Sequence, residues 1–386
     1  MKKLAILALG ALALGAASAQ SNVIKIASVS PLSGPQSGLG TAIAQGAQMA
    51  IEDAQARFQQ LGFQLQFAPQ DDQANPDVGV AVARRIVNDP DLLGIVGHLN
   101  SGVAIPASEI YKDTNLVMVS PANTNPRVTD RGYLSVNRIC GRDDVQGPVG
   151  AEYAVRILKR SRLFVIHDKT PYGQGLAEAF AARARELGAT VVALVGTEEA
   201  SNFQPLILQM RAQRPDLVYY GGIYDKGGVL VKQMRERGIT ATFMGGDGLD
   251  ASDLVKIAGS ASKGVLFTTT AGPISTLPKA AAFAQRYKAK FGKDPEAYAV
   301  YAYDSANVIL AGLEAAIKAN NGRKPTREQV ARAVREVKMD GLTGRIEFDS
   351  KGDRKLSDYY VVGLKEAKYP GEVLRVIQFA PPAARQ

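Results

Sequence analysis

Short apolar segments alternate with longer amphipathic segments through most of this chain. The short segments have the length and the β-branched content of strands, and the longer ones carry apolar residues at helical spacing. Strands are predicted at 23–29, 64–68, 93–96, 116–119, 163–167, 190–195, 216–220, 241–244 and 264–269. This alternation predicts parallel sheets that are covered by helices on both faces. Because about ten strands are too many for one core in a chain of 386 residues, we expect two α/β lobes.

The segments between the strands predict helices. They lie at 40–58, 77–88, 145–159, 173–187, 203–212, 227–237 and 251–257, and a further helix follows residue 101. After Pro273 the pattern changes to three helices, at 280–291, 298–318 and 327–337. Strand-like segments follow at 345–348, 357–364 and 373–378.

The segment 93–112 is typical of a strand, a loop and a helix in succession. Its apolar run ends at Gly97, and Ser101 opens the helical spacing as the predicted N-cap. A helix N-terminus carries unpaired N–H groups and the positive end of the helix dipole, so it suits a carboxylate or phosphate. A serine that only caps its own helix is the alternative, and this segment taken alone favours that alternative.

The N-terminus has the order of a secretory signal peptide. Lys2 and Lys3 precede an apolar run at 4–16, and Ala-Ser-Ala follows at 17–19. We therefore predict a signal peptide at 1–19, cleavage before Gln20, and an exported, soluble product. The apolar run is too short for a convincing membrane span, and no cysteine follows it as a lipid-attachment site.

The composition argues against several kinds of site. The formal charge falls from +9 to +7 when Lys2 and Lys3 leave with the signal peptide, and the basic residues are scattered along helix faces, so nucleic-acid binding is not expected. The single Cys140 excludes an internal disulfide, and two histidines disfavour a zinc site. The glycine pair at 173–175 lacks the third glycine of a dinucleotide loop, and no nucleophile elbow occurs. We expect no cofactor, no metal and no enzymatic activity.

Three titratable residues of the first half have structural interpretations. Asp71 and Asp72 are consecutive, so their side chains are expected to point apart, and we interpret them as capping and solvent contacts. His98 follows a buried strand and is interpreted as a hydrogen-bonded structural histidine rather than a base.

Open parallel sheets bind ligands beyond the carboxyl ends of their strands. The loops predicted there are rich in Gly, Ser, Thr, Tyr and Asp and lie at 33–39, 99–101, 122–124, 169–172, 221–225 and 245–247. Asp247 stands among glycines that would let the backbone approach a ligand, although an N-cap role for Asp247 or Asp250 is an alternative. An anion-binding helix start at Ser101 and a carboxylate at Asp247 would together fit a zwitterion.

Six motifs carry a resemblance to a known family. They are PLSGP (31–35), GHLNS (97–101), SPANT (120–124), HDKTPYGQG (167–175), VYYGG (218–222) and FMGGDG (243–248). In this order they resemble the branched-chain amino acid-binding proteins of bacterial ABC importers, the leucine/isoleucine/valine-binding family of type I periplasmic binding proteins. The likeness covers nearly the whole chain after the signal peptide.

The resemblance implies a Venus flytrap, with two Rossmann-like α/β lobes of parallel sheets joined by three crossover segments. Residues 20–142 and 272–348 would form the N-terminal lobe, and residues 143–271 and 349–386 the C-terminal lobe. It also implies a monomeric, non-enzymatic receptor in the periplasm or cell-envelope space. Such a receptor captures a branched-chain or related aliphatic amino acid and delivers it to the membrane permease subunits of an ABC importer.

Carried over residue by residue, the resemblance also implies a ligand site. Ser101, Thr124 and the backbone of Ala122 would hold the α-carboxylate, and Asp247 would pair with the α-ammonium. The positions that surround the ligand side chain in the family match Leu99, Tyr172 and Tyr298.

The sequence departs from the family pattern in three places. Leu39 stands where an aromatic residue is typical, and Ile223 stands where a tyrosine helps to bind the ammonium group, with Tyr224 one position later. These two changes leave the preferred side chain open. The disulfide positions of some relatives match Ala74 and Asn100, so that bond is absent.

Two other functions remain open on the sequence. One is a receptor of the same fold for amides, urea or aromatic acids, in which Ser101 and Asp247 would be used differently. The other is an exported α/β enzyme, against which the missing cofactor loop and the missing nucleophile–base pair argue.

Overall fold

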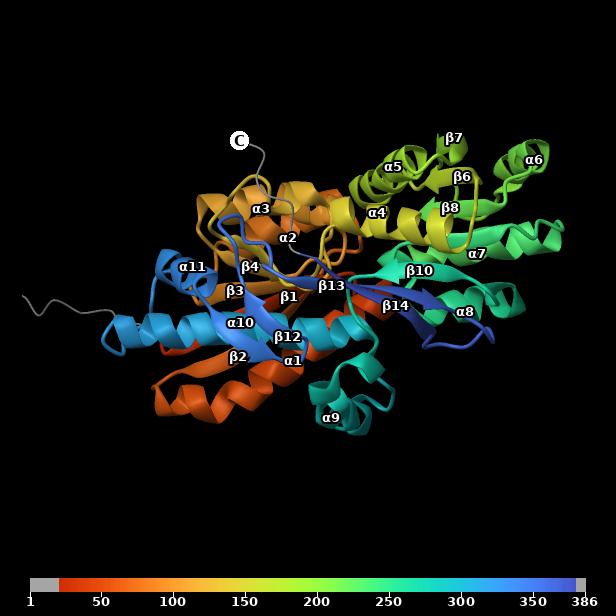
Figure 1. Cartoon of the computed structure of the whole chain (residues 1–386). Coiled ribbons are helices and arrows are strands. Elements are labelled where there is room, and N and C mark those ends of the chain that lie inside the picture. Colours follow the sequence, from red (N-terminus) through yellow and green to blue (C-terminus); the bar gives the residue numbers. More distant parts are fainter. Residues whose placement is uncertain (1–20, 380–386) are drawn as a thin grey trace, which may run out of the picture.

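Residues 21–379 are described by the computed structural model. The predicted signal peptide and its cleavage position therefore lie outside the described residues. Two sheets flanked by helices form two lobes that lie side by side, as Figure 1 shows. The predicted two-lobe α/β architecture is confirmed.

The first sheet has five parallel strands in the order β2-β1-β3-β4-β5. Its strands are β1 (Val23–Ser30), β2 (Gln64–Asp71), β3 (Leu92–Gly97), β4 (Val117–Ser120) and β5 (Val136–Arg138). Every residue of β3 and β4 is buried, which explains their continuous apolar runs. In Figure 1 one pair of helices covers each side of this sheet: α2 (Pro76–Ile86) with α3 (Ser101–Asp113), and α1 (Ser37–Gln60) with α10 (Ala297–Ala319).

The second sheet has seven strands in the order β14-β13-β10-β9-β8-β6-β7. Five of them are parallel: β6 (Arg162–His167), β7 (Thr190–Gly196), β8 (Leu217–Gly221), β9 (Thr242–Gly245) and β10 (Leu266–Thr269). Two antiparallel strands, β13 (Ser357–Gly363) and β14 (Glu372–Phe379), extend one edge. The helices of this lobe are α4 (Asp143–Glu152), α5 (Pro171–Glu186), α6 (Gln204–Gln213), α7 (Tyr224–Glu236) and α8 (Ser252–Ala258).

The chain passes between the lobes three times: after β5, after β10, and before β13. After β10 it forms α9 (Ala281–Phe291) and then α10, which packs along α1 of the first lobe. There it continues through α11 (Arg327–Arg335) and the hairpin of β11 (Lys338–Gly341) and β12 (Gly344–Glu347). The predicted boundaries between the two lobes, near residues 142, 271 and 348, stay predictions.

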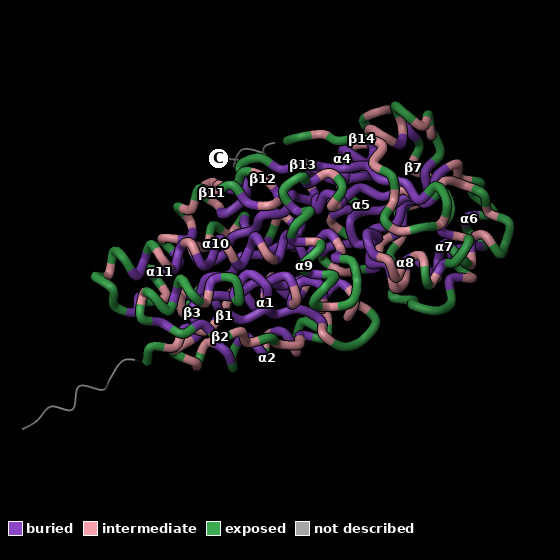
Figure 2. Tube along the Cα trace, turned by 90° about the horizontal axis from the view of Figure 1, so that it is seen from below, coloured by how far each residue is buried: buried purple, intermediate pink, exposed green. Residues whose placement is uncertain are grey.

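Buried side chains fill the interior of both lobes, whereas exposed residues gather at the loops and at the outer edge strand β14, as Figure 2 shows. One apolar cluster runs through both lobes, from Ile43 of α1 to Phe243 of β9. The loops at the carboxyl ends of the two sheets are thereby held on packed cores.

The sequence periodicity gave the wrong bounds for one helix and missed two short strands. The helix predicted at 145–159 begins at Asp143 and changes after Glu152 into a π-helical turn, η2 (Tyr153–Ile157). Strands β5 and β11 were not predicted, because three or four residues carry little periodicity. Each is defined by its partner strand, β4 for β5 and β12 for β11.

Candidate functional site

A cleft of about 200 Å³ lies between the lobes. The loops after β1, β3 and β4 supply one wall, the loops after β6, β8 and β9 supply the other, and the start of α10 adds to them. This is the carboxyl edge of both sheets, where open parallel sheets bind ligands. Eight of the ten predicted site residues line it: Leu39, Leu99, Ser101, Ala122, Tyr172, Ile223, Asp247 and Tyr298.

The other two predicted residues do not line the cleft. Thr124 is fully buried, and its Oγ1 has no hydrogen-bond partner within the described residues. Tyr224 opens α7, and its hydroxyl donates to the carbonyl of Pro35, 2.9 Å away in the first lobe. Tyr224 therefore joins the lobes beside the cleft.

Ser101 is not the N-cap that the sequence predicts. The extended backbone at the cap position belongs to Asn100, and Ser101 is the first helical residue of α3. The Ser101 hydroxyl instead accepts the N–H of Asn125 at 3.3 Å. As the first residues of the helix, Ser101 and Gly102 still present N–H groups that lack intrahelical acceptors, and both residues line the cleft.

Asp247 is a buried carboxylate held by three donors. Its Oδ1 accepts from the Tyr172 hydroxyl at 2.7 Å and from Gln146 Nε2 at 3.0 Å, and its Oδ2 accepts from the Tyr298 hydroxyl at 2.5 Å. Burial raises the pKa of Asp247, while these hydrogen bonds act in the opposite direction. No cation among the described residues pairs with it.

The alternative capping role of this segment is wrong. Asp247 begins a 3₁₀ turn whose cap residue is Gly246, and α8 is preceded by Ala251 without a side-chain cap. A Cβ at Gly248 would lie 2.4 Å from the carbonyl oxygen of Gly222, so a glycine is needed where this loop meets the loop after β8. The turn serves to present Asp247 rather than to start a helix.

Two residues behind Asp247 were not predicted. Gln146 is fully buried in α4 and bridges Asp247 to the carbonyl of Thr268 at 3.0 Å. Asp143 is also buried, and neither of its carboxylate oxygens has a hydrogen-bond partner within the described residues. Burial, and then the negative charge of Asp247, raise the pKa of Asp143 well above its usual value. Asp143 and Asp247 therefore lie close enough for the charge of one to suppress ionisation of the other.

The rim of the cleft is polar, as the predicted loops suggested. Gln36, Asn100, Thr170 and Asp225 lie in those loops, and Asp168 and Lys226 directly adjoin them. Burial raises the pKa values of Asp168 and Asp225. In sequence these residues resemble ordinary turn and helix-start residues, so no pattern distinguishes them.

His98 is structural, as predicted. It is fully buried, with Nδ1 2.8 Å from Asp72 Oδ2 and Nε2 3.0 Å from the Tyr111 hydroxyl. The solvent contact predicted for Asp72 is wrong, because Asp72 is buried against His98. Its Oδ1 does accept the N–H of Ala74 at 3.1 Å, which is a local capping contact. Asp71 points elsewhere and accepts the N–H of Leu32 at 2.8 Å.

The glycines at 173–175 serve packing. A Cβ at Gly173 would lie 2.4 Å from the carbonyl oxygen of Gly221, so the start of α5 lies directly against β8. Within residues 21–379 no group of three or more His, Cys, Asp and Glu side chains is arranged to hold a metal ion. None of the helices in this range has the length and apolar character needed to span a bilayer.

Comparison with known proteins shows similarity along most of the chain. A family model described as periplasmic binding protein matches residues 23–369. An amino acid binding protein of Pseudomonas aeruginosa is 38% identical over 86% of this chain and 87% of its own length. A Leu/Ile/Val-binding protein homolog of Brucella abortus is 35% identical over 85% and 87%. The crystal structure of a leucine binding protein from Thermotoga maritima superposes with a TM-score of 0.84, at 29% identity over 92% of this chain and 98% of that one.

Proposed function

The chain belongs to the periplasmic binding protein family, and from this premise we propose that it is the extracytoplasmic receptor of an ABC importer for branched-chain or related aliphatic amino acids. In this proposal it captures the amino acid between its lobes, delivers it to membrane permease subunits, and performs no catalysis. It works as a monomer in the periplasm or cell-envelope space after loss of its signal peptide.

The observation that carries the proposal is a pair of complementary charges on opposite walls of one cleft. The first turn of α3, at Ser101 and Gly102, offers N–H donors and the positive end of a helix dipole to a carboxylate. Asp247 offers a buried carboxylate without a counter-charge to an ammonium group. An α-amino acid carries both groups on one carbon, and desolvating them is tolerable only when both are paired.

Thr124 and Asp143 support the same proposal. Buried polar atoms without partners destabilise a protein by about 1–3 kcal/mol each. Thr124 Oγ1 makes no hydrogen bond of good geometry within the described residues, although it lies near enough to Asp143 to act against the rise in the pKa of that carboxyl. We propose that Thr124 completes the carboxylate site, with the backbone of Ala122, once a ligand is bound.

Apolar walls favour an aliphatic side chain. Leu39, Leu99 and Ile223 line the cleft together with Tyr298, and the volume of about 200 Å³ suits a small ligand. A neutral amide, urea or an aromatic acid would leave Asp247 buried without a cationic partner, so an amino acid is the better fit.

Closure of the lobes on the ligand is part of the proposal. The Tyr224 hydroxyl contacts the Pro35 carbonyl across the lobes, and Asn125 Nδ2 donates to the Pro171 carbonyl at 2.6 Å. Such direct contacts hold a closed form, and a ligand that bridges the walls shifts the population further toward it. We propose hinges near residues 142, 271 and 348, where the lobes at 20–142 with 272–348 and at 143–271 with 349–386 would meet.

Titration calorimetry of the purified protein with leucine, isoleucine, valine, alanine, acetamide, urea and benzoate tests the proposal. We expect binding of at least one aliphatic amino acid. Leucine at about 100 times its Kd should then raise the free energy of unfolding by roughly 2.7 kcal/mol. Binding of acetamide, urea or benzoate with no response to any amino acid would contradict the assignment.

A Ser101→Ala substitution should weaken leucine binding only about 3- to 10-fold. One hydroxyl hydrogen bond is lost, worth about 0.5–1.5 kcal/mol, while the N–H groups of the first turn of α3 remain. Calorimetry against Ser108→Ala checks this, because Ser108 is another buried serine of α3 that does not line the cleft. An unchanged affinity in Ser101→Ala would show that the hydroxyl does not bind the carboxylate.

A further inference from the structure

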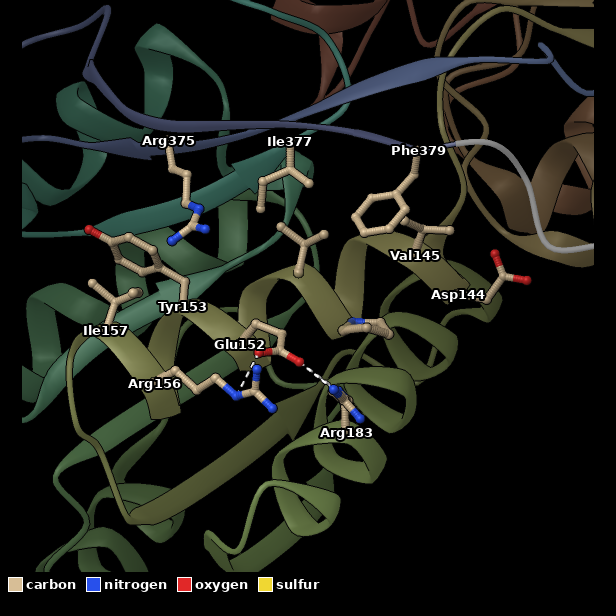
Figure 3. A pocket seen from close by; sticks show the side chains of 12 residues that line it. Asp144, Val145, Glu152, Tyr153, Arg156, Ile157, Arg183, Arg375, Ile377 and Phe379 are labelled. Carbon is tan, nitrogen blue, oxygen red and sulfur yellow. Dashed lines mark hydrogen bonds and ion pairs between the residues drawn. The ribbon is translucent and has the colours of Figure 1, made fainter.

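A second hollow, of about 570 Å³, lies apart from the cleft. It runs between the edge strand β14 and the continuous helical segment of α4 and η2, as Figure 3 shows. We call it the β14 groove. Its walls are mostly apolar side chains: Val145, Val149, Tyr153, Ile157, Ile377 and Phe379. A volume in this range is typical of small-molecule sites.

The groove is long and narrow because of how a strand presents its side chains. Arg375, Ile377 and Phe379 alternate along β14, so all three point toward the helix, as Figure 3 shows. Four residue steps at about 3.3 Å make this row about 13 Å long. Phe379 is 45% exposed and Ile157 on the facing turn is 49% exposed. These two side chains belong to one continuous apolar lining, with Val149, Tyr153 and Ile377 between them, and are not scattered single residues.

The charges in the groove are unbalanced at one end. Arg156 and Arg183 both pair with Glu152, and Arg183 pairs with Glu186 as well. Arg375 makes no ion pair and no side-chain hydrogen bond within residues 21–379. Its guanidinium group lies on the Tyr153 side of the groove, whereas Phe379 lies at the opposite end of the row. Of the three arginines that line the groove, Arg375 alone has no acidic partner within residues 21–379. The carboxylate of Asp144 lies at the Phe379 end and pairs with Arg142.

We propose that the β14 groove binds a linear aliphatic carboxylate, the free anion of a fatty acid. Its chain covers the apolar row from Ile377 to Phe379 and the facing side chains of α4 and η2, which removes both surfaces from water. Its carboxylate pairs with the guanidinium group of Arg375, which has the planar geometry for two parallel hydrogen bonds. This inference does not depend on the function proposed for the cleft.

Titration calorimetry with dodecanoate, below its micelle concentration, tests this on the full exported chain. We expect saturable binding with one site per chain, which persists when leucine is present in saturating amount. Arg375→Glu should weaken dodecanoate binding at least about tenfold and create binding of dodecylammonium, because the charge at the end of the groove is reversed. Lys368→Glu is the matched control: it makes the same charge change on an exposed loop that does not line the groove and should leave dodecanoate binding unchanged.

Each other outcome overturns the proposal. Displacement of dodecanoate by leucine would assign the binding to the cleft. Equal loss of affinity in Arg375→Glu and Lys368→Glu would show a general charge effect. Binding to phospholipid vesicles without binding of free dodecanoate would identify a membrane surface as the partner. Binding that occurs only when the chain is shortened to end at Phe379 would identify residues 380–386 as the natural occupant.

Discussion

Replacing Asp247 with alanine should weaken leucine binding by roughly 30-fold to several thousand-fold, which corresponds to about 2–5 kcal/mol. The carboxylate of Asp247 is buried, and its three donors are neutral groups, Tyr172, Tyr298 and Gln146. No cationic side chain among the described residues pairs with it, so the α-ammonium group of a bound ligand would supply its positive partner. Without Asp247 that ammonium group would be desolvated and unpaired, which is the state that proteins avoid most strongly.

Titration calorimetry of Asp247→Ala and of the isosteric Asp247→Asn measures this effect. Asp250→Asn is the matched control, because Asp250 is also buried in the same loop but does not line the cleft. Burial raises the pKa of Asp250 to about 7, so at neutral pH its amide replacement removes about half a negative charge from the same loop without touching the cleft. We expect Asp250→Asn to bind leucine within a few-fold of the parent. An Asp247→Ala variant that binds leucine as tightly as the parent would refute the ammonium site.

The same carboxylate predicts a pH dependence of binding. Burial raises the pKa of Asp247 above its ordinary value of 3.8 in the ligand-free protein. An ammonium ligand binds the ionised form, so affinity should be constant from the raised pKa up to the pH at which the ligand amine deprotonates, and should fall as the pH drops through the raised pKa of Asp247. This loss on the acid side should be absent in Asp247→Asn, which has no proton to gain at that position.

The sequence predicted the cleft well for a physical reason. Parallel strands end at one edge, so loops that follow successive strands meet there whatever their separation along the chain. Ser101 and Asp247 are 146 positions apart, yet each follows a strand at the carboxyl edge of its sheet. Identifying the ligand groups of single residues rested on the resemblance, since a polar loop does not reveal its ligand by itself.

Contacts that depend on packing between distant segments could not be predicted. Gln146 lies in a helix that follows the first crossing, and nothing in its spacing points to Asp247. The sequence around Asp72 is typical of a turn. Strand β1 lies between β2 and β3, and the loops that follow β2 and β3 bring Asp72 and His98 into contact. The β14 groove likewise depends on an edge strand from the end of the chain lying beside α4.

Replacing Asp353 with asparagine should lower the free energy of unfolding by about 3–5 kcal/mol. Asp353 lies in the segment between β12 and β13, the third crossing. It is buried and pairs with Arg138 at 2.6 Å and with Arg142 at 2.7 Å. Arg138 is fully buried, and Asp353 is its one acidic partner within residues 21–379. The substitution leaves this guanidinium group desolvated and unpaired, which is the costly way to break a buried pair.

The pH dependence of stability provides a second measurement. Burial acts to raise the pKa of Asp353, but the charges of Arg138 and Arg142 outweigh it and lower the pKa to about 2. Because this lies below the ordinary value of 3.8, the stabilisation is complete above about pH 4 and is lost as the pH falls toward 2. Urea unfolding between these pH values should show a larger loss of stability in the parent than in Asp353→Asn, because the other carboxyls with lowered pKa values, such as that of Asp130, titrate in both proteins.

Asp130→Asn is the matched control for Asp353→Asn. Asp130 also pairs with Arg142, at 2.8 Å, but its side chain is 44% exposed, so its loss should change the free energy of unfolding by no more than about 1 kcal/mol.

Arg138 also donates to the carbonyls of Asn123 and Asn125, both at 2.9 Å, in the loop that carries Ala122 and Thr124. Asp353→Asn should therefore weaken leucine binding as well as stability, whereas Asp130→Asn should change neither strongly. Equal destabilisation by the two substitutions would show that burial of the Arg138–Asp353 pair is not what stabilises the crossing.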